Sequence, residues 1–234
     1  MNLETIRIAF VAAVLYALKV IAADVSSAYI QAMTIEKVYT TAGPEFGSTQ
    51  GRFMIIVKAL YGLRSSGAMW HQHLAESLRA LGFRPCEADP DLWMREMQDH
   101  YEYIAVIVDD LLIFSRCPQD IIDFLTKAEG YELKGVGIPE YFSGADIEYD
   151  ESKGCWIYSA KTYVKSVCEH IEKLLNIKLK NYGSPMEAGD HPELDDTDML
   201  FGSEISIYQM LVGCAQWAVI LGRFDIQFTT NTMA

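Results

Sequence analysis

Disulfide and zinc-binding patterns are both missing from this sequence of 234 residues. It holds five cysteines, an odd number, and no two of them form a C-x-x-C pair. Such scattered cysteines argue against a disulfide framework and against a zinc site. They favour reduced thiols in the core of an intracellular protein.

Positive charge is also scarce. The chain has 19 Lys and Arg against 32 Asp and Glu, which gives a formal net charge of −13. A general nucleic-acid binder depends on Lys and Arg to contact phosphates, so this balance argues against one. Half of the residues are hydrophobic and 22% are charged, which indicates a packed globular protein. The length allows one large core, or one domain with a smaller appendage.

No apolar segment is long enough to cross a membrane. The longest candidate is the run of 11 apolar residues between Arg7 and Lys19, too short for about 30 Å of hydrocarbon. A signal-peptide core tolerates this length, so a targeting segment is one interpretation. We favour the other, a buried helix over residues 3–16 followed by a strand over 19–25.

The patterning predicts a mixture of helices and strands without repeats. A main domain is expected over residues 1–150 and a mostly helical appendage over 151–234. Residues 40–52 are expected to form a turn-rich loop, 53–60 a buried strand, and 181–203 a polar linker. Further helices are predicted over 65–83, 118–129, 161–177 and 205–221, and further strands over 92–97, 102–108, 111–115, 131–134, 140–149 and 155–159.

Two adjacent aspartates interrupt the apolar segment YEYIAVIVDDLLIFS, residues 101–115. An uncompensated carboxylate in apolar surroundings costs on the order of several kcal/mol. A hairpin resolves the conflict, because its strands bury the aliphatic residues while its tip stays solvated. We therefore expect Asp109 and Asp110 at a hairpin tip that can reach a ligand.

Asp24 ends another apolar strand in the same way. If the two strands are neighbours in one sheet, Asp24 and Asp109 can share an ion. Mg²⁺ prefers such oxygen ligands, and two ions about 3.5–4 Å apart serve phosphoryl transfer. The alternative is a solvated turn with no ligand, which is the commoner meaning of an isolated Asp-Asp pair. The matching context of Asp24 favours the metal site.

Several motifs resemble reverse transcriptases of Ty1/copia-type retrotransposons, the polymerase domain of the Pol polyprotein. They occur in the family's order and spacing from about residue 5 to the end: DVSSAYIQA (24–32), KALYGLRSSGAMW (58–70), GFRPCEADPDLWMR (82–95), AVIVDDLLIFS (105–115), YFSGADIEY (141–149), YQMLVGCAQWA (208–218) and GRFDI (222–226). The resemblance implies an α+β fold with a palm-type antiparallel sheet backed by helices and partial fingers. Residues 151–234 would form a mostly helical thumb or connection segment.

The resemblance also implies the catalytic residues. Asp24, Asp109 and Asp110 match the polymerase triad, and the Val25 carbonyl would be a further ligand for two Mg²⁺ ions, with Mn²⁺ as a substitute. The position of Ile107 usually carries Tyr or Phe at the primer end in reverse transcriptases, so Ile107 and its neighbour Val108 are expected near the primer. The missing ring puts primer handling in question.

Nucleotide and primer contacts follow from the same motifs. Tyr29 matches the aromatic gate that excludes a ribose 2′-hydroxyl, although a buried tyrosine on a short helix is the plainer interpretation. Tyr61 and Gly62 match the backbone near the incoming nucleotide. The predicted primer-grip hairpin consists of Tyr141, Phe142, Ser143 and Gly144.

Template-primer of RNA or DNA and dNTPs are the partners that the resemblance implies, with ribonuclease H and integrase modules in the full element and no membrane. The parent element would act in cytoplasmic particles or in the nucleus, ahead of DNA integration. Because the family's basic fingers precede the helix that opens this chain, the resemblance implies an N-terminally truncated domain. The competing hypothesis is a non-catalytic palm remnant that acts as an interaction module.

Overall fold

The computed structural model describes residues 1–186 and 198–234. The chain divides into two compact units, Met1–Pro139 and Glu140–Ala234. The domain boundary predicted at residue 150 stays a prediction. Part of the predicted linker over 181–203 lies outside the described residues. No described helix is both long and apolar enough to pass through a bilayer.

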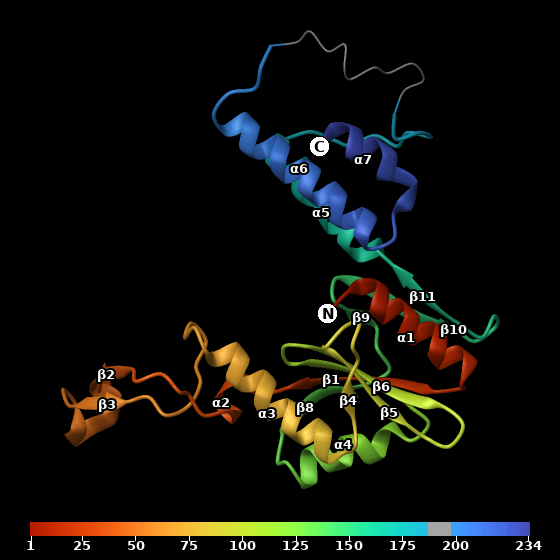
Figure 1. Ribbon diagram of the computed structural model, residues 1–234. Coiled ribbons are helices and arrows are strands. Elements are labelled where there is room, and N and C mark those ends of the chain that lie inside the picture. The colour runs from red at the N-terminus through yellow and green to blue at the C-terminus, as the bar shows by residue number, and fades with distance from the viewer. Residues whose placement is uncertain (187–197) are drawn as a thin grey trace. The chain divides into compact units, whose positions relative to one another are not determined.

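The first unit is built on a six-stranded antiparallel sheet with the order β4-β5-β6-β7-β1-β8 (Figure 1). Its strands are β1 (Lys19–Val25), β4 (Arg84–Pro85), β5 (Leu92–Glu96), β6 (Tyr101–Ile107), β7 (Asp110–Ser115) and β8 (Leu133–Gly137). Its helices are α1 (Leu3–Leu15), α2 (Ala28–Gln31), α3 (Ser66–Ala80) and α4 (Pro118–Lys127). This arrangement confirms the predicted α+β class with an antiparallel sheet backed by helices.

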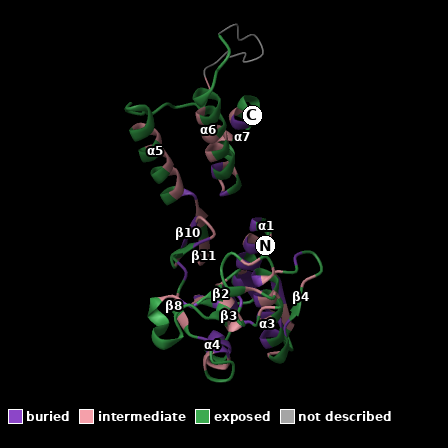
Figure 2. Ribbon diagram, turned by 90° about the vertical axis from the view of Figure 1, so that its left-hand side faces the viewer, coloured by how far each residue is buried: buried purple, intermediate pink, exposed green. Residues whose placement is uncertain are grey.

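Helices cover the sheet on both faces, which explains the continuous apolar sequence of β7. Leu111 and Ile113 belong to the core formed with α3 and α4. Phe114 points to the other face, where its ring meets Phe10 of α1 edge-on at 5.2 Å between centroids. A strand covered on both sides has no solvent face, so the apolar/polar alternation disappears. Figure 2 shows the buried residues gathered in these layers.

One prediction is wrong at the two-stranded antiparallel sheet of β2 (Tyr39–Thr41) and β3 (Phe53–Ile55). The apolar run 53–60 was expected to be one buried strand, but its strand ends at Ile55 and Phe53 is 83% exposed. Among the described residues this sheet has only the two strands, and Phe53 and Ile55 stay exposed on it. Between the strands, residues Pro44–Thr49 form the 3-10 helix η1 inside the predicted loop.

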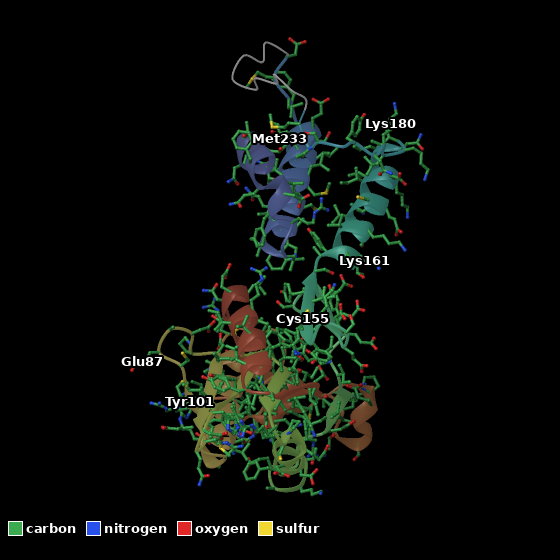
Figure 3. The ribbon with its side chains drawn as sticks, turned by 90° about the vertical axis from the view of Figure 1, so that its right-hand side faces the viewer. Glu87, Tyr101, Cys155, Lys161, Lys180 and Met233 are labelled. Carbon is green, nitrogen blue, oxygen red and sulfur yellow. The ribbon has the colours of Figure 1, made fainter. Side chains whose placement is uncertain are left out.

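The described residues of the second unit combine a small sheet with a helical part. β9 (Tyr141–Phe142), β10 (Ala145–Asp150) and β11 (Cys155–Ser159) pair in the order β11-β10-β9. The helical part consists of α5 (Lys161–Leu175), α6 (Ser203–Ile220), the 3-10 helix η3 (Phe224–Ile226) and α7 (Gln227–Met233). Figure 3 labels Cys155 and Lys161, where β11 and α5 begin.

Candidate active site

The aspartate pair lies at the turn between β6 and β7, with Asp109 in a loop of two residues and Asp110 as the first residue of β7. Ile107 pairs with Asp110, so Val108 and Asp109 alone connect the strands. Val108 has a φ of +58°, a conformation that β-branched residues rarely adopt. A two-residue hairpin with positive φ at its first loop position is the type II′ geometry, where glycine is usual. The turn is therefore held in a strained form.

Strand β1 brings Asp24 to this turn. In the antiparallel register Asp24 lies opposite Asp110, and the Val25 amide donates a hydrogen bond of 2.9 Å to the Asp109 carbonyl. Directly opposed residues of an antiparallel pair project to the same face, so the side chains of Asp24 and Asp110 share one side of the sheet. On its other edge Asp24 lies opposite Lys134 of β8, next to a register shift.

Two tyrosines lie beside the aspartates. The Tyr61 hydroxyl donates a hydrogen bond of 3.4 Å to Asp109 Oδ2, and the Tyr61 ring lies 4.3 Å from the ring of Tyr29. Burial raises the pKa of Tyr61, and the charges of Asp109 and Asp24 raise it further. Both carboxylates thus act electrostatically on the same phenol. Gly62 follows with a φ of +96°, which favours glycine at this position.

The carboxylates repel one another. Although Asp110 is exposed, partial burial of its carboxyl raises its pKa, and the negative charges of Asp109 and Asp24 add to the increase. Within residues 1–186 and 198–234, none of these three aspartates takes part in an ion pair. Concentrated negative charge on oxygen ligands is the setting that suits a divalent cation.

The carboxylates of Asp24, Asp109 and Asp110 influence one another electrostatically but do not form a complete metal-coordination site. In the described part of the chain, no three His, Cys, Asp or Glu side chains converge enough to hold an ion. The donor set of carboxylates and a neighbouring backbone carbonyl fits Mg²⁺ chemically, because Mg²⁺ retains several waters and takes only one or two protein carboxylates.

The predicted primer-grip residues belong to the second unit. Tyr141 is exposed, whereas Phe142 is buried at 4% exposure. Ser143 and Gly144 form the turn between β9 and β10 and have φ values of +51° and +89°. A Cβ on Gly144 would approach the Trp217 indole nitrogen to 3.3 Å, so this turn packs tightly against α6.

Sequence comparison adds an independent observation to this geometry. The sequence model of the family described as reverse transcriptase (RNA-dependent DNA polymerase) matches residues 1–183. The chain belongs to the reverse transcriptase family. This match agrees with the helix-backed antiparallel sheet that the resemblance implied.

This member of the family resembles proteins of yeast transposons, which confirms the predicted Ty1/copia type. It is 28% identical over 228 residues to the Transposon Ty1-NL2 Gag-Pol polyprotein of Saccharomyces cerevisiae, a match that covers 90% of this chain and 12% of the relative. It is 27% identical over 220 residues to a Transposon Ty5-1 protein of the same organism, covering 90% of this chain and 68% of the relative. The chain thus spans a small part of the Gag-Pol polyprotein.

The sequence analysis missed the support of the aspartate turn. Trp70 was expected only as part of a family motif, yet its indole Nε1 donates a hydrogen bond of 2.6 Å to the Val108 carbonyl. The two residues are 38 positions apart, so no local pattern could reveal the contact. The sequence predicted the helix over 65–83 that carries Trp70, but it gave no sign of the turn as its partner.

Proposed function

We propose that this reverse transcriptase is an RNA-directed DNA polymerase domain that joins a primer 3′-hydroxyl to the α-phosphate of a dNTP. The observation that carries the proposal is the register of β1 against β7, which sets Asp24 opposite Asp110 and beside Asp109. Three carboxylates on adjacent backbone segments would hold two divalent cations, with the Val25 carbonyl as a further ligand.

Cations held by these carboxylates would supply activation of the attacking hydroxyl and stabilisation of charge on the leaving oxygen. The chain's own residues position the reactants. The backbone hydrogen bond from Val25 to Asp109 fixes the turn relative to β1. Tyr61 orients the Asp109 carboxylate through its hydroxyl, and the Tyr29 ring, tilted by 38° against that of Tyr61, forms an aromatic wall beside it. Such a wall would contact the sugar of an incoming nucleotide.

Primer extension on an RNA template tests the proposal. The protein is assayed as residues 1–234 and as the same residues joined to the segment that precedes the matching region in the Ty1 relative. We expect weak extension by the first protein, because a chain of net charge −13 has few cations for the triphosphate. The second protein should extend the primer faster, because the resemblance implies basic fingers in the added segment, and these would bind the triphosphate.

The Asp109→Asn variant separates chemistry from folding. It should lower extension by more than about 10²-fold, since even residues outside the ligand set cost about 10–100-fold at metal sites. Asp120→Asn is the matched control, because Asp120 is an exposed carboxylate of α4, the helix that follows the end of β7 opposite the turn. If the fused parent protein folds but stays inert, the interaction-module hypothesis replaces the polymerase.

Tyr29→Val tests the nucleotide gate. Removing the ring should increase incorporation of ribonucleotides relative to deoxynucleotides, because the space for a 2′-hydroxyl opens. Tyr61→Phe keeps the ring that contacts Tyr29 and serves as the control, which should retain the discrimination. Unchanged discrimination in Tyr29→Val would show that Tyr29 is only a packed tyrosine.

A further inference from the structure

We propose that Trp70 is a positioning residue for the aspartate turn: its indole holds the strained Val108 conformation and thereby sets the direction of the Asp109 and Asp110 carboxylates. This inference rests on the proposed metal-binding role of those carboxylates. Trp70 itself touches no substrate in the proposal and acts only through the turn.

The first support is the contact itself. Trp70 lies on α3, is 2% exposed, and donates from Nε1 to the Val108 carbonyl at 2.6 Å. Because the indole is buried, water reaches its Nε1 poorly, and replacing Trp70 removes the donor that the Val108 carbonyl accepts from. The rest of the indole is fixed by packing, with the Tyr131 ring at 5.7 Å between centroids.

The second support is that two consecutive carbonyls of the turn are held from different directions. Trp70 of α3 holds the Val108 carbonyl, and the Val25 amide of β1 holds the Asp109 carbonyl. With both peptide planes fixed, the Asp109 side chain has little freedom beyond its own rotamers. A metal ligand needs such fixed direction, because small displacements weaken binding.

The third support is the backbone strain. Val108 keeps a φ of +58° although a β-branched side chain disfavours it. Such a conformation persists only where surrounding interactions enforce it. The Trp70 hydrogen bond is the side-chain interaction that enforces it here, acting on the carbonyl of the strained residue itself.

Hydrogen exchange of two adjacent amides tests the inference without any substrate. The Val25 amide donates to Asp109, whereas the Ser26 amide donates to Glu132 at 2.9 Å and reports on the opposite edge of β1. In Trp70→Phe, which keeps an aromatic ring, we expect exchange at Val25 to accelerate about fivefold, the size of one lost hydrogen bond. Exchange at Ser26 should stay unchanged.

Mn²⁺ affinity and a matched variant extend the test. Trp70→Phe should weaken Mn²⁺ binding about fivefold. Trp93→Phe is the control, because Trp93 is also 2% exposed but lies on β5, paired with Ile104 and Pro85 away from the turn. It should lower stability without changing Mn²⁺ affinity or Val25 exchange. Equal effects of the two variants would overturn the positioning role.

Val108→Gly provides a rescue that a merely structural tryptophan would not show. Glycine adopts positive φ without strain, so the turn no longer needs the indole. The effect of Trp70→Phe on Val25 exchange should shrink from about fivefold to under about twofold in this background. An undiminished effect would overturn the inference. If Trp70→Phe does not fold, Val108→Gly alone should slow Val25 exchange, and faster exchange would contradict us.

The outcomes distinguish this inference from the proposed function. Absence of Mn²⁺ binding in the parent protein, or binding that survives Asp109→Asn, would refute the metal site while the exchange experiment still decided whether Trp70 holds the turn. Normal metal binding with unaltered exchange in Trp70→Phe would refute the positioning role and leave the polymerase proposal standing.

Discussion

Carboxylates in different surroundings lie near the two ends of strand β6. Near its beginning, Glu102 is 2% exposed and surrounded by donors. Its Oε2 accepts from Arg95 at 2.5 and 3.2 Å, and its Oε1 accepts from the Ser115 hydroxyl at 2.5 Å and the Arg116 amide at 3.3 Å. At the other end, Asp110 and its neighbours face one another with no ion pair among the described residues.

The pKa values of Glu102 and Asp110 are shifted in opposite directions. Burial by itself would raise the pKa of Glu102, but the hydrogen bonds from Ser115 and Arg95 and the charge of Arg95 lower it below its usual value. For Asp110, burial and the charges of Asp109 and Asp24 all raise the pKa. Glu102 is thus surrounded by donors that lower its pKa, whereas Asp109 accepts a longer hydrogen bond of 3.4 Å from Tyr61 and the charges around Asp110 are all negative. The second arrangement suits the proposed cation site.

The largest effect is expected from Glu102→Gln. Removing one partner of a buried ion pair leaves Arg95 without its counter-charge, so the free energy of unfolding should fall by about 3 kcal/mol. Urea unfolding measures the loss. Glu96→Gln, an exposed change at the end of the adjacent strand, should stay within about 0.5 kcal/mol. Similar stabilities for the two variants would remove the contrast between the sites.

Acid should reproduce part of that loss. Because the pKa of Glu102 is lowered in the folded state, its contribution is complete above the usual value of 4.5 and is lost as the pH falls through the folded pKa. The stability difference between the parent protein and Glu102→Gln should therefore shrink below about pH 4.5. A difference independent of pH would show that the charge of Glu102 is unimportant.

Mg²⁺ should stabilise the aspartate site alone. At a tenfold excess over its dissociation constant, an ion bound only to the folded protein adds about 1.4 kcal/mol. Thermal unfolding should show this gain in the parent protein and in Glu102→Gln, but not in the double variant Asp24→Asn, Asp109→Asn. Retention of the gain in the double variant would place the ion elsewhere.

The smallest effect is the relief of repulsion in Asp110→Asn. Since the folded pKa of Asp110 is raised, its ionisation costs stability above that pKa, and the cost disappears as the pH falls. Neutralising it should raise stability at neutral pH by less than about 1 kcal/mol, because the exposed side chain is screened. Added salt should reduce the gain, and a loss of stability would show that Asp110 has structural partners.

Much of the secondary structure was predictable from the sequence because it depends on local patterns. The strand over 19–25 and the strand at 155–159 were predicted with their observed bounds. The hairpin tip at Asp109 followed from charge inside an apolar run. The prediction of a buried strand over 53–60 was wrong for the same reason that the others were right. An apolar run indicates burial, but here Phe53 and Ile55 remain exposed to solvent.

The sequence by itself determined the periodicities, the turn with two aspartates and the resemblance to a reverse transcriptase, since each is carried by neighbouring residues. Only the tertiary structure decided that β1 pairs with β7, that Arg95 and Ser115 converge on Glu102, and that Trp70 holds Val108. Local patterns fix which side chains avoid water, but they leave open which distant backbone or donor meets them. That choice is made by strand order and register, which depend on the packing of the whole sheet.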